Sequence, residues 1–399
     1  MEEEILKNAH HALMERCVRP FHSPDELPED IRRQIATLDP SPKKKRIAAL
    51  HYGGTFLMKP DARGELEPVN DPSIILEAIG SKGAGDLKDA QIIWIPVYEP
   101  LIDSIEARWY HWVSIGNLIR LLYDHFDGFA VLGGTDTMAQ MVAALGLMFP
   151  RKFGKPIICT GAQASVFQMW SDAMQNLYFC FSAAMHPISG VYLAFNNVLR
   201  RAINVRKIKD KGFDAFTGPA STIVGSLDSD GVHVFPHAPP SNPFITSREL
   251  IYLPNFRDGI HPIEICPALL GSTIQKSGDN ADTQVVLLVS LGAGNMRTKP
   301  SFPGEITHID GMRALIQRGI PVVVGSSMVD GSMQSPYAAG GEVRRADAIL
   351  RGTCTGAMLE AKIQHCLARA WSVAGDRVDL DEFRRLMETD LIGELSIGY

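Results

Sequence analysis

The sequence predicts an α/β fold, with a larger N-terminal domain built on a parallel sheet and a smaller C-terminal α/β domain. Short apolar segments alternate with helical stretches, a pattern typical of parallel strands that helices cover on both faces. The chain has 399 residues, more than one hydrophobic core usually serves. A proline-rich stretch interrupts the alternation, and strands and helices resume after it.

The N-terminal elements follow an extension, residues 1–45, in which Ile5, Ala9, Leu13 and Cys17 recur at helical spacing. Short apolar runs predict strands at 47–50, 92–95, 129–132, 156–160 and 191–195. The stretches between them predict helices over about 108–123, 136–149 and 169–184. We expect the second helix to pack in the core through Met138, Met141, Val142, Leu145 and Met148.

The interruption suggests the domain boundaries. Residues 217–258 look irregular, with prolines at 236, 239, 240, 243 and 254. We therefore expect a first domain at 46–235, a linker at 236–258 and a second domain at 259–399. Within the second domain, strands are predicted at 285–290 and 321–324, and helices near 309–318 and 355–371.

Charge and composition exclude several classes of protein. The formal net charge is −6, whereas nucleic-acid-binding proteins usually present a basic face, and the short basic run at 43–46 is expected to be a solvated lead-in. The start Met1-Glu2-Glu3-Glu4 does not resemble a secretory signal, and no stretch reaches the roughly 18 apolar residues that span a bilayer. We expect a cytoplasmic protein that binds neither nucleic acid nor membrane.

The six cysteines indicate neither a disulfide framework nor a metal site. None forms a CxxC pair or lies near a histidine pattern typical of zinc. Cys159 and Cys180 lie in apolar runs and are expected in the core.

Small-residue turns follow three of the predicted strands. Gly53-Gly54-Thr55 follows the first, Gly133-Gly134-Thr135-Asp136 the third, and Gly161-Ala162-Gln163 the fourth. Each turn alone is also explained as a plain turn or a helix cap. Ligands of parallel sheets bind where the carboxyl ends of the strands meet, so the three turns together predict a binding site.

A threonine hydroxyl at such a site is a weak nucleophile. It must pass its proton to a base, or to a lysine that its surroundings keep neutral. Lys207 follows the fifth predicted strand. A lysine there is ordinarily a surface residue, so its candidacy depends on the resemblance that follows.

These runs resemble, in order and spacing, the signatures of the L-asparaginase and glutaminase family, the bacterial-type asparaginases with a threonine nucleophile. The run Gly134-Thr135-Asp136-Thr137-Met138 is the most specific, and Gly53-Gly54-Thr55 is specific only beside it. Further matching segments are 160–163, 171–172 with 176–177, 207 with 213–216, 290–295 and 337–341. The resemblance covers about residues 46–370 and indicates a divergent, cytoplasmic, type I-like member.

The resemblance implies a two-step hydrolysis of an amide. Thr55 would be the nucleophile that forms an acyl-enzyme and releases ammonia. Thr135, Asp136 and Lys207 would form a companion group for proton transfer. Backbone N–H groups at the Thr55 and Thr135 turns would stabilise the oxyanion.

The resemblance also implies the surroundings of the substrate, a small-molecule amide. Asp136 would hold its α-ammonium group and Ser104, beside Asp103, its α-carboxylate. The backbone of Ala162 would contact the leaving amide, and Gly134 would lie against the substrate. Family members are typically tetramers built from intimate dimers, so the resemblance implies a homodimer or homotetramer in which Asn295 would reach a neighbouring site. The family implies no metal or organic cofactor.

Departures from the family pattern leave the substrate open. Residues 56–97 contain no tyrosine, although the family's mobile lid usually carries one. Tyr52 replaces a threonine and Gly133 a histidine; Ile105 and Ala357 also depart from common residues. A charged, solvated loop and a lid adapted to another substrate both explain the first departure. Asparagine and asparagine-derived amides both remain candidates.

Two other functions are compatible with the same scaffold. One is a non-catalytic homologue that binds an amino acid. The other is the ammonia-donating subunit of an amidotransferase, which the N-terminal extension suggests. At about 45 residues, however, the extension is short for a further folded domain, and a helix packed on the body also explains it.

Overall fold

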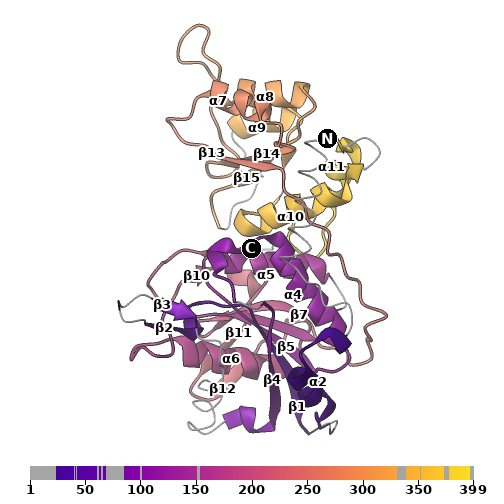
Figure 1. Ribbon diagram of the computed structural model, residues 1–399. Helices are drawn as coiled ribbons and strands as arrows, with labels where there is room; N and C mark the ends of the chain where they lie inside the picture. The colour runs from indigo at the N-terminus through magenta and orange to yellow at the C-terminus, as the bar shows by residue number, and fades with distance from the viewer. Residues whose placement is uncertain are drawn as a thin grey trace. The chain divides into compact units, whose positions relative to one another are not determined.

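The computed structural model describes residues 24–39, 41, 43–60, 63, 66–68, 85–98, 101–150, 153–329, 338–350, 352–372 and 377–395. They form two compact units (Figure 1). The first comprises the described residues up to Arg201, Lys209–Ala215 and Val224–Pro254; the second comprises Ala202–Ile208, Phe216–Ile223 and the described residues from Asn255 onward. The helix expected over residues 5–17 lies outside the described residues.

The first unit is built on an eight-stranded sheet with the order β12-β11-β8-β7-β6-β5-β1-β4. Its parallel part, β4-β1-β5-β6-β7, contains the strands that the sequence predicts. Their bounds are β1 Lys45–His51, β4 Ala90–Pro96, β5 Gly128–Leu132, β6 Pro156–Thr160 and β7 Gly190–Phe195. In this register His51 lies beside Leu132, and Leu132 beside Thr160. The α/β class is confirmed, and the turns after β1, β5 and β6 meet at one edge.

Strands that the sequence analysis does not predict extend this sheet. They are β8 Val198–Arg201, β11 Ile223–Asp228 and β12 Gly231–Val234. β8 returns antiparallel to β7 after Asn196 and Asn197, whose φ angles are 46° and 65°. β11 and β12 form a hairpin that turns at Gly231, with φ 112°. The sequence predicts irregular structure for residues 217–258, and that prediction is wrong for this hairpin. The Asp-Gly pair within the hairpin and the Asn-Asn pair before β8 are both turn signals.

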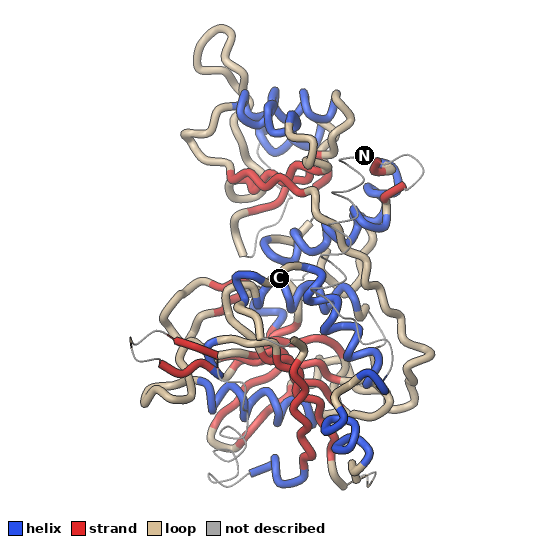
Figure 2. The backbone as a smooth tube through the Cα atoms, viewed as in Figure 1, coloured by secondary structure: helices blue, strands red, loops and turns tan. Residues whose placement is uncertain are grey.

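Helices cover the sheet on both faces. Their bounds are α4 Trp109–Leu122, α5 Met138–Met148 and α6 Ala173–Met185, and the shorter α2 spans Glu29–Ala36. α4 and α5 pack together on one face, and α6 packs on the other (Figures 1 and 2). The predicted apolar stripe of α5 is fully buried, which confirms its role in the core. Cys159 and Cys180 are also fully buried, as expected.

The basic run at 43–46 is not wholly a solvated lead-in. The guanidinium group of Arg46 donates to both carboxylate oxygens of Asp127, at 2.9 and 3.0 Å. The same carboxylate accepts from the backbone N–H of Arg46 at 2.9 Å. Because Asp127 directly precedes β5, this bidentate pair fixes the start of β1 against the start of β5.

The proline-rich segment after β12 runs along the first unit. The backbone N–H groups of Ser241, Asn242 and Leu253 donate to carbonyl oxygens of Pro187, Gly154 and Met148, each at 2.9 Å. Up to Pro254 this segment is therefore fastened to the body of the first unit by its backbone.

The second unit contains a four-stranded sheet with the order β13-β14-β15-β16, in which all neighbours are parallel. The strands are β13 Ile260–Glu264, β14 Val285–Ser290, β15 Val322–Ser326 and β16 Ile349–Leu350. The helices are α7 Gly271–Lys276, α8 His308–Gln317, α9 Ala338–Arg345, α10 Gly356–Arg369 and α11 Leu380–Glu388. The predicted strands and helices correspond to β14, β15, α8 and α10. β13, α7 and α11 are not predicted, because they are short or mostly polar.

Three two-stranded ladders complete the described elements. They are β2 Met58–Pro60 with β3 Leu66–Pro68 in the first unit, and β9 Arg206–Lys207 with β10 Phe216–Thr217 and β17 Trp371–Ser372 with β18 Arg377–Val378 in the second.

A buried ion pair anchors the last described residues of the second unit. Lys362 on α10 and Glu394 contact each other, and both side chains are 0% exposed. The ammonium group also donates to the carbonyl oxygen of Thr389 at 2.6 Å. The carboxylate accepts from the backbone N–H groups of Leu391 and Ile392 at 2.8–3.2 Å. The pair is thus solvated by protein groups in place of water.

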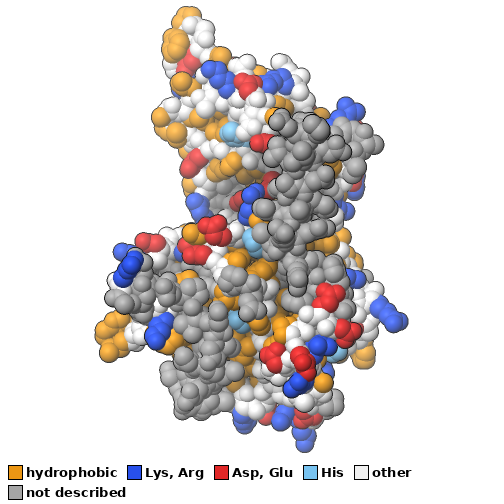
Figure 3. Space-filling view, viewed as in Figure 1, with side chains coloured by type: hydrophobic (Ala, Val, Ile, Leu, Met, Phe, Trp, Pro, Cys, Tyr) orange, Lys and Arg blue, Asp and Glu red, His pale blue; other side chains and the backbone are white. Residues whose placement is uncertain are grey.

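On the face drawn in Figure 3, acidic and basic side chains of the described residues are interspersed. Among the helices that the structure describes, none combines the length and the apolar composition needed to cross a bilayer.

Candidate active site

Two glycine turns pack against each other at the carboxyl edge of the large sheet. Gly54, after β1, has a φ of 110°, which side chains with a Cβ rarely adopt. A Cβ atom added at Gly54 would lie 2.4 Å from the backbone nitrogen of Gly134 and 2.5 Å from the carbonyl carbon of Gly133. The turn that precedes Thr55 is therefore in backbone contact with the turn that precedes Thr135.

The segment around Ser104 closes the same edge. A Cβ atom on Gly53 would lie 2.1 Å from the carbonyl oxygen of Ile102, and one on Gly134 would lie 2.4 Å from Oγ of Ser104. Ser104 is buried, and it begins a short 3-10 turn that the carboxylate of Asp103 caps. Three segments far apart in the sequence thus meet through glycines.

Thr55 begins the 3-10 turn Thr55–Leu57 and is half-buried. The next side chain, Phe56, is fully buried in the core beneath α6. The hydroxyl of Ser165 donates to the carbonyl oxygen of Met58. The backbone on the C-terminal side of Thr55 is thus anchored to the loop that follows β6.

The turn before α5 presents Thr135 and Asp136. The hydroxyl of Thr137 donates to the carbonyl oxygen of Ser104 at 2.8 Å, and the helix begins only at Met138. Thr135 is 6% exposed, whereas Asp136 is exposed to solvent. The helix predicted from 136 therefore starts later, because residues 135–137 form the site turn.

The turn that carries Ala162 is held by two residues whose role the sequence analysis does not assign. The carboxylate of Asp172 accepts from the backbone N–H groups of Gln163, at 3.0 and 3.1 Å, and Ala164, at 2.9 Å. The amide of Asn176 donates to that carboxylate at 2.9 Å and to the carbonyl oxygen of Gly161 at 3.1 Å. Asp172 and Asn176 are four residues apart, so both side chains project from the same face at the start of α6 and bond the loop that carries Ala162.

Gln163 is a further residue of this edge whose role is not predicted from the sequence. Its carbonyl oxygen Oε1 accepts from the hydroxyl of Thr135 at 3.1 Å. Its amide nitrogen Nε2 donates to the carbonyl oxygens of Lys209 at 3.2 Å and Gly212 at 3.3 Å. Gln163 therefore bridges the Thr135 turn and the loop at 209–214.

Lys207 lies in the second unit, on β9, where it is paired with Phe216 of β10. The segment is fixed by Asn204, a buried residue with a φ of 52°. The side chain of Asn204 donates to the carbonyl oxygen of Thr353 at 2.5 Å and accepts from the backbone N–H of Thr355 at 3.0 Å.

Asn295 also lies in the second unit, at the end of a tight turn after β14. Its backbone exchanges hydrogen bonds with Leu291, at 2.9 and 3.1 Å. Gly292 and Gly294 adopt positive φ within the turn, and the hydroxyl of Ser326 donates to the carbonyl oxygen of Gly292. The turn therefore lies at the carboxyl edge of the smaller sheet.

The structure brings most of the predicted site residues to one edge of the first unit. They are Thr55, Asp103, Ser104, Gly134, Thr135, Asp136 and Ala162. Lys207 and Asn295 belong to the second unit.

Two buried side chains lie directly below this edge. Burial lowers the pKa of His51 to about 4, so the imidazole is neutral at pH 7. Burial raises the pKa of the Tyr52 hydroxyl well above its usual value of about 10, so it keeps its proton. Neither group carries charge at neutral pH, so the polar chemistry of this edge comes from hydroxyls, backbone N–H groups and carboxylates such as those of Asp103 and Asp136. The described residues contain no cluster of His, Cys, Asp or Glu suited to a metal ion.

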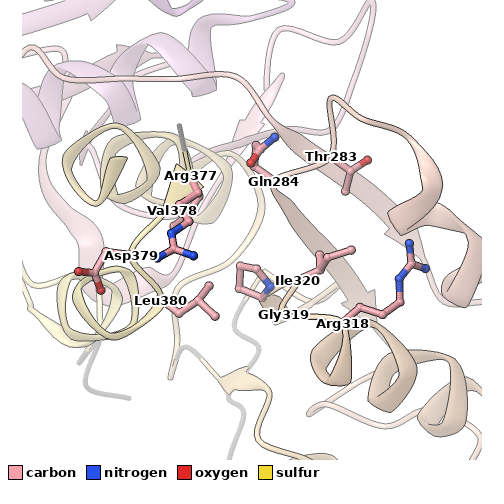
Figure 4. Close-up of a pocket in the computed structure, with 10 residues that line it drawn as sticks. Thr283, Gln284, Arg318, Gly319, Ile320, Arg377, Val378, Asp379 and Leu380 are labelled. Carbon is pink, nitrogen blue, oxygen red and sulfur yellow. The ribbon is translucent and has the colours of Figure 1, made fainter. Parts of the chain in front are cut away.

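The second unit has an open pocket with a volume of about 620 Å³ near α11. Its lining side chains come from three segments, which contribute Thr283 and Gln284, residues 318–321, and residues 377–380 (Figure 4). None of the predicted catalytic residues lines it. The guanidinium of Arg318 is bonded to Asp279, at 2.9 Å. We assign no role in the chemistry to this pocket.

Comparison with known proteins identifies relatives of this chain. Residues 46–240 match the family domain described as Asparaginase, N-terminal. The chain is 29% identical over 356 residues to L-asparaginase 1 of Escherichia coli K12, covering 89% of this chain and 99% of that protein. The chain therefore contains an asparaginase N-terminal domain and is similar to L-asparaginases over most of its length. It also shares the fold of solved asparaginases. It superposes on L-asparaginase I of Vibrio cholerae with a TM-score of 0.73, 26% identity and coverage of 88% and 99%. For the thermostable L-asparaginase of Thermococcus kodakarensis the TM-score is 0.75, with 23% identity and coverage of 89% and 100%.

Proposed function

We propose that this protein is an amidohydrolase that cleaves the side-chain amide of asparagine or of an asparagine-derived compound and releases ammonia. The asparaginase N-terminal domain and the similarity to L-asparaginases support hydrolysis of an amide C–N bond. The observation that supports the site most strongly is the contact of the Gly54 turn with the Gly134 turn, because it places the threonine that follows each glycine at one edge.

In the first step, the hydroxyl oxygen of Thr55 attacks the amide carbon of the substrate. The Thr55 proton passes to the companion group formed by Thr135, Asp136 and Lys207, and the carbonyl oxygen becomes an oxyanion. Backbone N–H groups of the two glycine turns stabilise that oxyanion, an effect worth about 3 kcal/mol per donor. Collapse of the intermediate breaks the C–N bond, and the leaving nitrogen takes a proton and departs as ammonia.

In the second step, water attacks the ester between Thr55 and the acyl group. The companion group accepts a proton from the water, and the oxygen of Thr55 regains a proton as the ester bond breaks. The products are the free carboxylic acid and the restored threonine. Two modest barriers thus replace one large one.

The remaining residues of the edge orient the substrate. Asp136 is exposed, as a carboxylate that receives an α-ammonium group must be, and Ser104 lies under Gly134, where it would hold the α-carboxylate. The backbone of Ala162, in the turn held by Asp172, would contact the leaving amide. Since residues 56–97 contain no tyrosine, a substituted asparagine is as good a candidate as the free amino acid.

We further propose that the protein is cytoplasmic and forms a homodimer or homotetramer in which Asn295 reaches a neighbouring site. Analytical ultracentrifugation would show the assembly directly. A monomer that retains full activity would exclude an essential contribution from a neighbour.

The test of function is ammonia release from a panel that contains asparagine, glutamine, their D-forms and N- or C-substituted asparagines. The wild type should turn over at least one of these, and Thr55→Ala should lose turnover by about 10³-fold or more while unfolding at the same temperature. Thr55→Ser keeps a hydroxyl at the same position and should retain more turnover than Thr55→Ala.

A matched control is Thr217→Ala, a threonine of the second unit that the proposal gives no role. It should leave turnover unchanged. Full activity in Thr55→Ala would reject Thr55 as the nucleophile, and tight binding of an asparagine derivative without ammonia release would favour a non-catalytic binding protein.

A further inference from the structure

Gln163 has a fully determined orientation in the structure. Its nitrogen Nε2 faces the carbonyl oxygens of Lys209 and Gly212 at 3.2 and 3.3 Å. Carbonyl oxygens only accept, so the atom that faces them must be the NH₂ group. The other end of the amide, which faces Thr135, is therefore the carbonyl oxygen Oε1.

This orientation decides where the hydroxyl proton of Thr135 lies. Oε1 can only accept, so the hydrogen bond of 3.1 Å between it and Thr135 Oγ1 uses the single proton of that hydroxyl. In every other contact the oxygen of Thr135 acts as an acceptor. Thr135 is 6% exposed, so water cannot easily replace Gln163 as its partner.

Gln163 is itself held at both ends. Its backbone N–H donates to both oxygens of Asp172, at 3.0 and 3.1 Å. Its side chain contacts the loop at 209–214, which an ion pair between Lys209 and Asp214 closes. This loop directly follows the segment that carries Lys207 in the sequence. A glutamine fixed in this way holds Thr135 with little freedom to turn.

We infer that Gln163 is a positioning residue that fixes the hydroxyl of Thr135 as a hydrogen-bond acceptor, which orients the attacking hydroxyl or water while the transferred proton goes to another member of the companion group. The inference rests on the proposed function, in which Thr135 belongs to the group that takes up the proton. With its own proton held by Gln163, the oxygen of Thr135 presents lone pairs to the hydrogen of the attacking nucleophile or water. Without Gln163 the hydroxyl rotates, and a fraction of molecules presents hydrogen where a lone pair is needed.

The test compares Gln163→Leu, which removes acceptor and donor at similar volume, with Gln163→Glu, which keeps an acceptor and adds charge. In Gln163→Leu we expect kcat to fall about tenfold or more, with KM changed less than about threefold. Gln163→Glu should retain more activity than Gln163→Leu. Its pH profile of kcat should shift to higher pH, because a carboxylate beside Thr135 favours the protonated form of a nearby base.

Matched variants separate this role from mere support of the fold. Gln175→Leu changes an exposed glutamine of the same unit, bonded to Asn197, and should keep wild-type kcat. Asp214→Asn weakens the ion pair of the loop without touching Gln163. If support of the loop were the whole role, Asp214→Asn and both Gln163 variants would lose thermal stability and kcat together, and every pH profile would keep its wild-type shape.

The outcomes for Gln163 and for the function are distinct. If wild-type protein releases ammonia and Thr55→Ala does not, but Gln163→Leu keeps wild-type kcat and pH profile, only the role of Gln163 is overturned. If the wild type releases no ammonia from any amide of the panel, the proposed function fails, and the role of Gln163 fails with it.

Discussion

The ring of Tyr52 fills the space in which any side chain at Gly133 would lie. A Cβ atom on Gly133 would be 2.0 Å from Cζ and 2.3 Å from the hydroxyl oxygen of Tyr52. Tyr52 is buried, with 1% of its surface exposed. Because Gly133 begins the turn that carries Thr135, the packing under the site depends on this pair.

We therefore expect Gly133→Ala to lower the free energy of unfolding by about 1–3 kcal/mol through overpacking, and to lower turnover because the site turn shifts. Adding Tyr52→Ala should make room, so the double variant should be less destabilised than the sum of the single variants. Chemical denaturation of all three proteins measures this. Strict additivity would show that the two residues do not compete for space.

Tyr52→Phe is the matched control, because it keeps the ring and should not rescue Gly133→Ala. The hydroxyl of Tyr52 is buried without a hydrogen-bond partner among the described residues. By itself this variant should be as stable as the wild type, or more stable by about 1 kcal/mol. A clear loss of stability would reveal a bonded hydroxyl.

Asp172→Ala should disturb the turn that carries Ala162. It leaves the backbone N–H groups of Gln163 and Ala164 without their acceptor, at a cost of about 2–4 kcal/mol. Turnover should fall with it, and Asp172→Asn, which keeps one acceptor oxygen, should lie between Asp172→Ala and the wild type. Denaturant unfolding and ammonia release would be measured together, and a fully active, stable Asp172→Ala would contradict the role of this carboxylate.

Stability should fall as the pH drops below about 6.5. Burial lowers the pKa of His51, His111 and His365 to about 4. The unfolded chain binds these protons near pH 6.5, whereas the folded protein excludes them until about pH 4. The stabilisation is therefore complete above the unfolded pKa and is lost towards pH 4, by about 1 kcal/mol per histidine between pH 7.5 and 5.5.

Urea unfolding at these two pH values measures the loss. His111→Asn provides a control, because Nδ1 of His111 accepts from the backbone N–H of Arg108 at 2.9 Å, and the oxygen of Asn can replace that acceptor without titrating. Its stability should depend less on pH than that of the wild type. An unchanged dependence would show that His111 is not buried as a neutral ring.

Breaking the buried pair of Lys362 and Glu394 should destabilise the second unit strongly. Lys362→Met leaves the carboxylate buried without its counter-ion, at a cost of about 3–5 kcal/mol. The double variant Lys362→Met/Glu394→Gln should be no worse than the single variant, because no uncompensated charge remains. Arg385→Met, which breaks the exposed pair with Glu382, should change stability far less. Equal losses in both single variants would argue against burial of the Lys362 pair.

Much of the fold could be predicted, because strands and helices that are buried in the core appear in the sequence as runs of apolar residues. The five parallel strands of the first unit are apolar runs, and α5 is apolar on every side, as expected of elements covered on both faces. The missed strands β8 and β12 have only four residues each, and the six residues of β11 include Gly225, Ser226 and Asp228, which interrupt its apolar pattern. Only their turns, at Asn196-Asn197 and Asp230-Gly231, carried a clear signal.

The sequence alone determined the fold class, the asparaginase resemblance and the position of each glycine turn at a strand end, because periodicity and turn chemistry are local properties of the chain. The tertiary structure decided which distant groups meet. It brings Gly54 into contact with Gly134. It orients the amide of Gln163 so that its oxygen faces Thr135 and its nitrogen faces the carbonyls of Lys209 and Gly212. It also buries the ion pair of Lys362 and Glu394. The residues in these contacts are far apart in the sequence, and no local pattern predicts that they meet. They come together only when complete helices and strands pack.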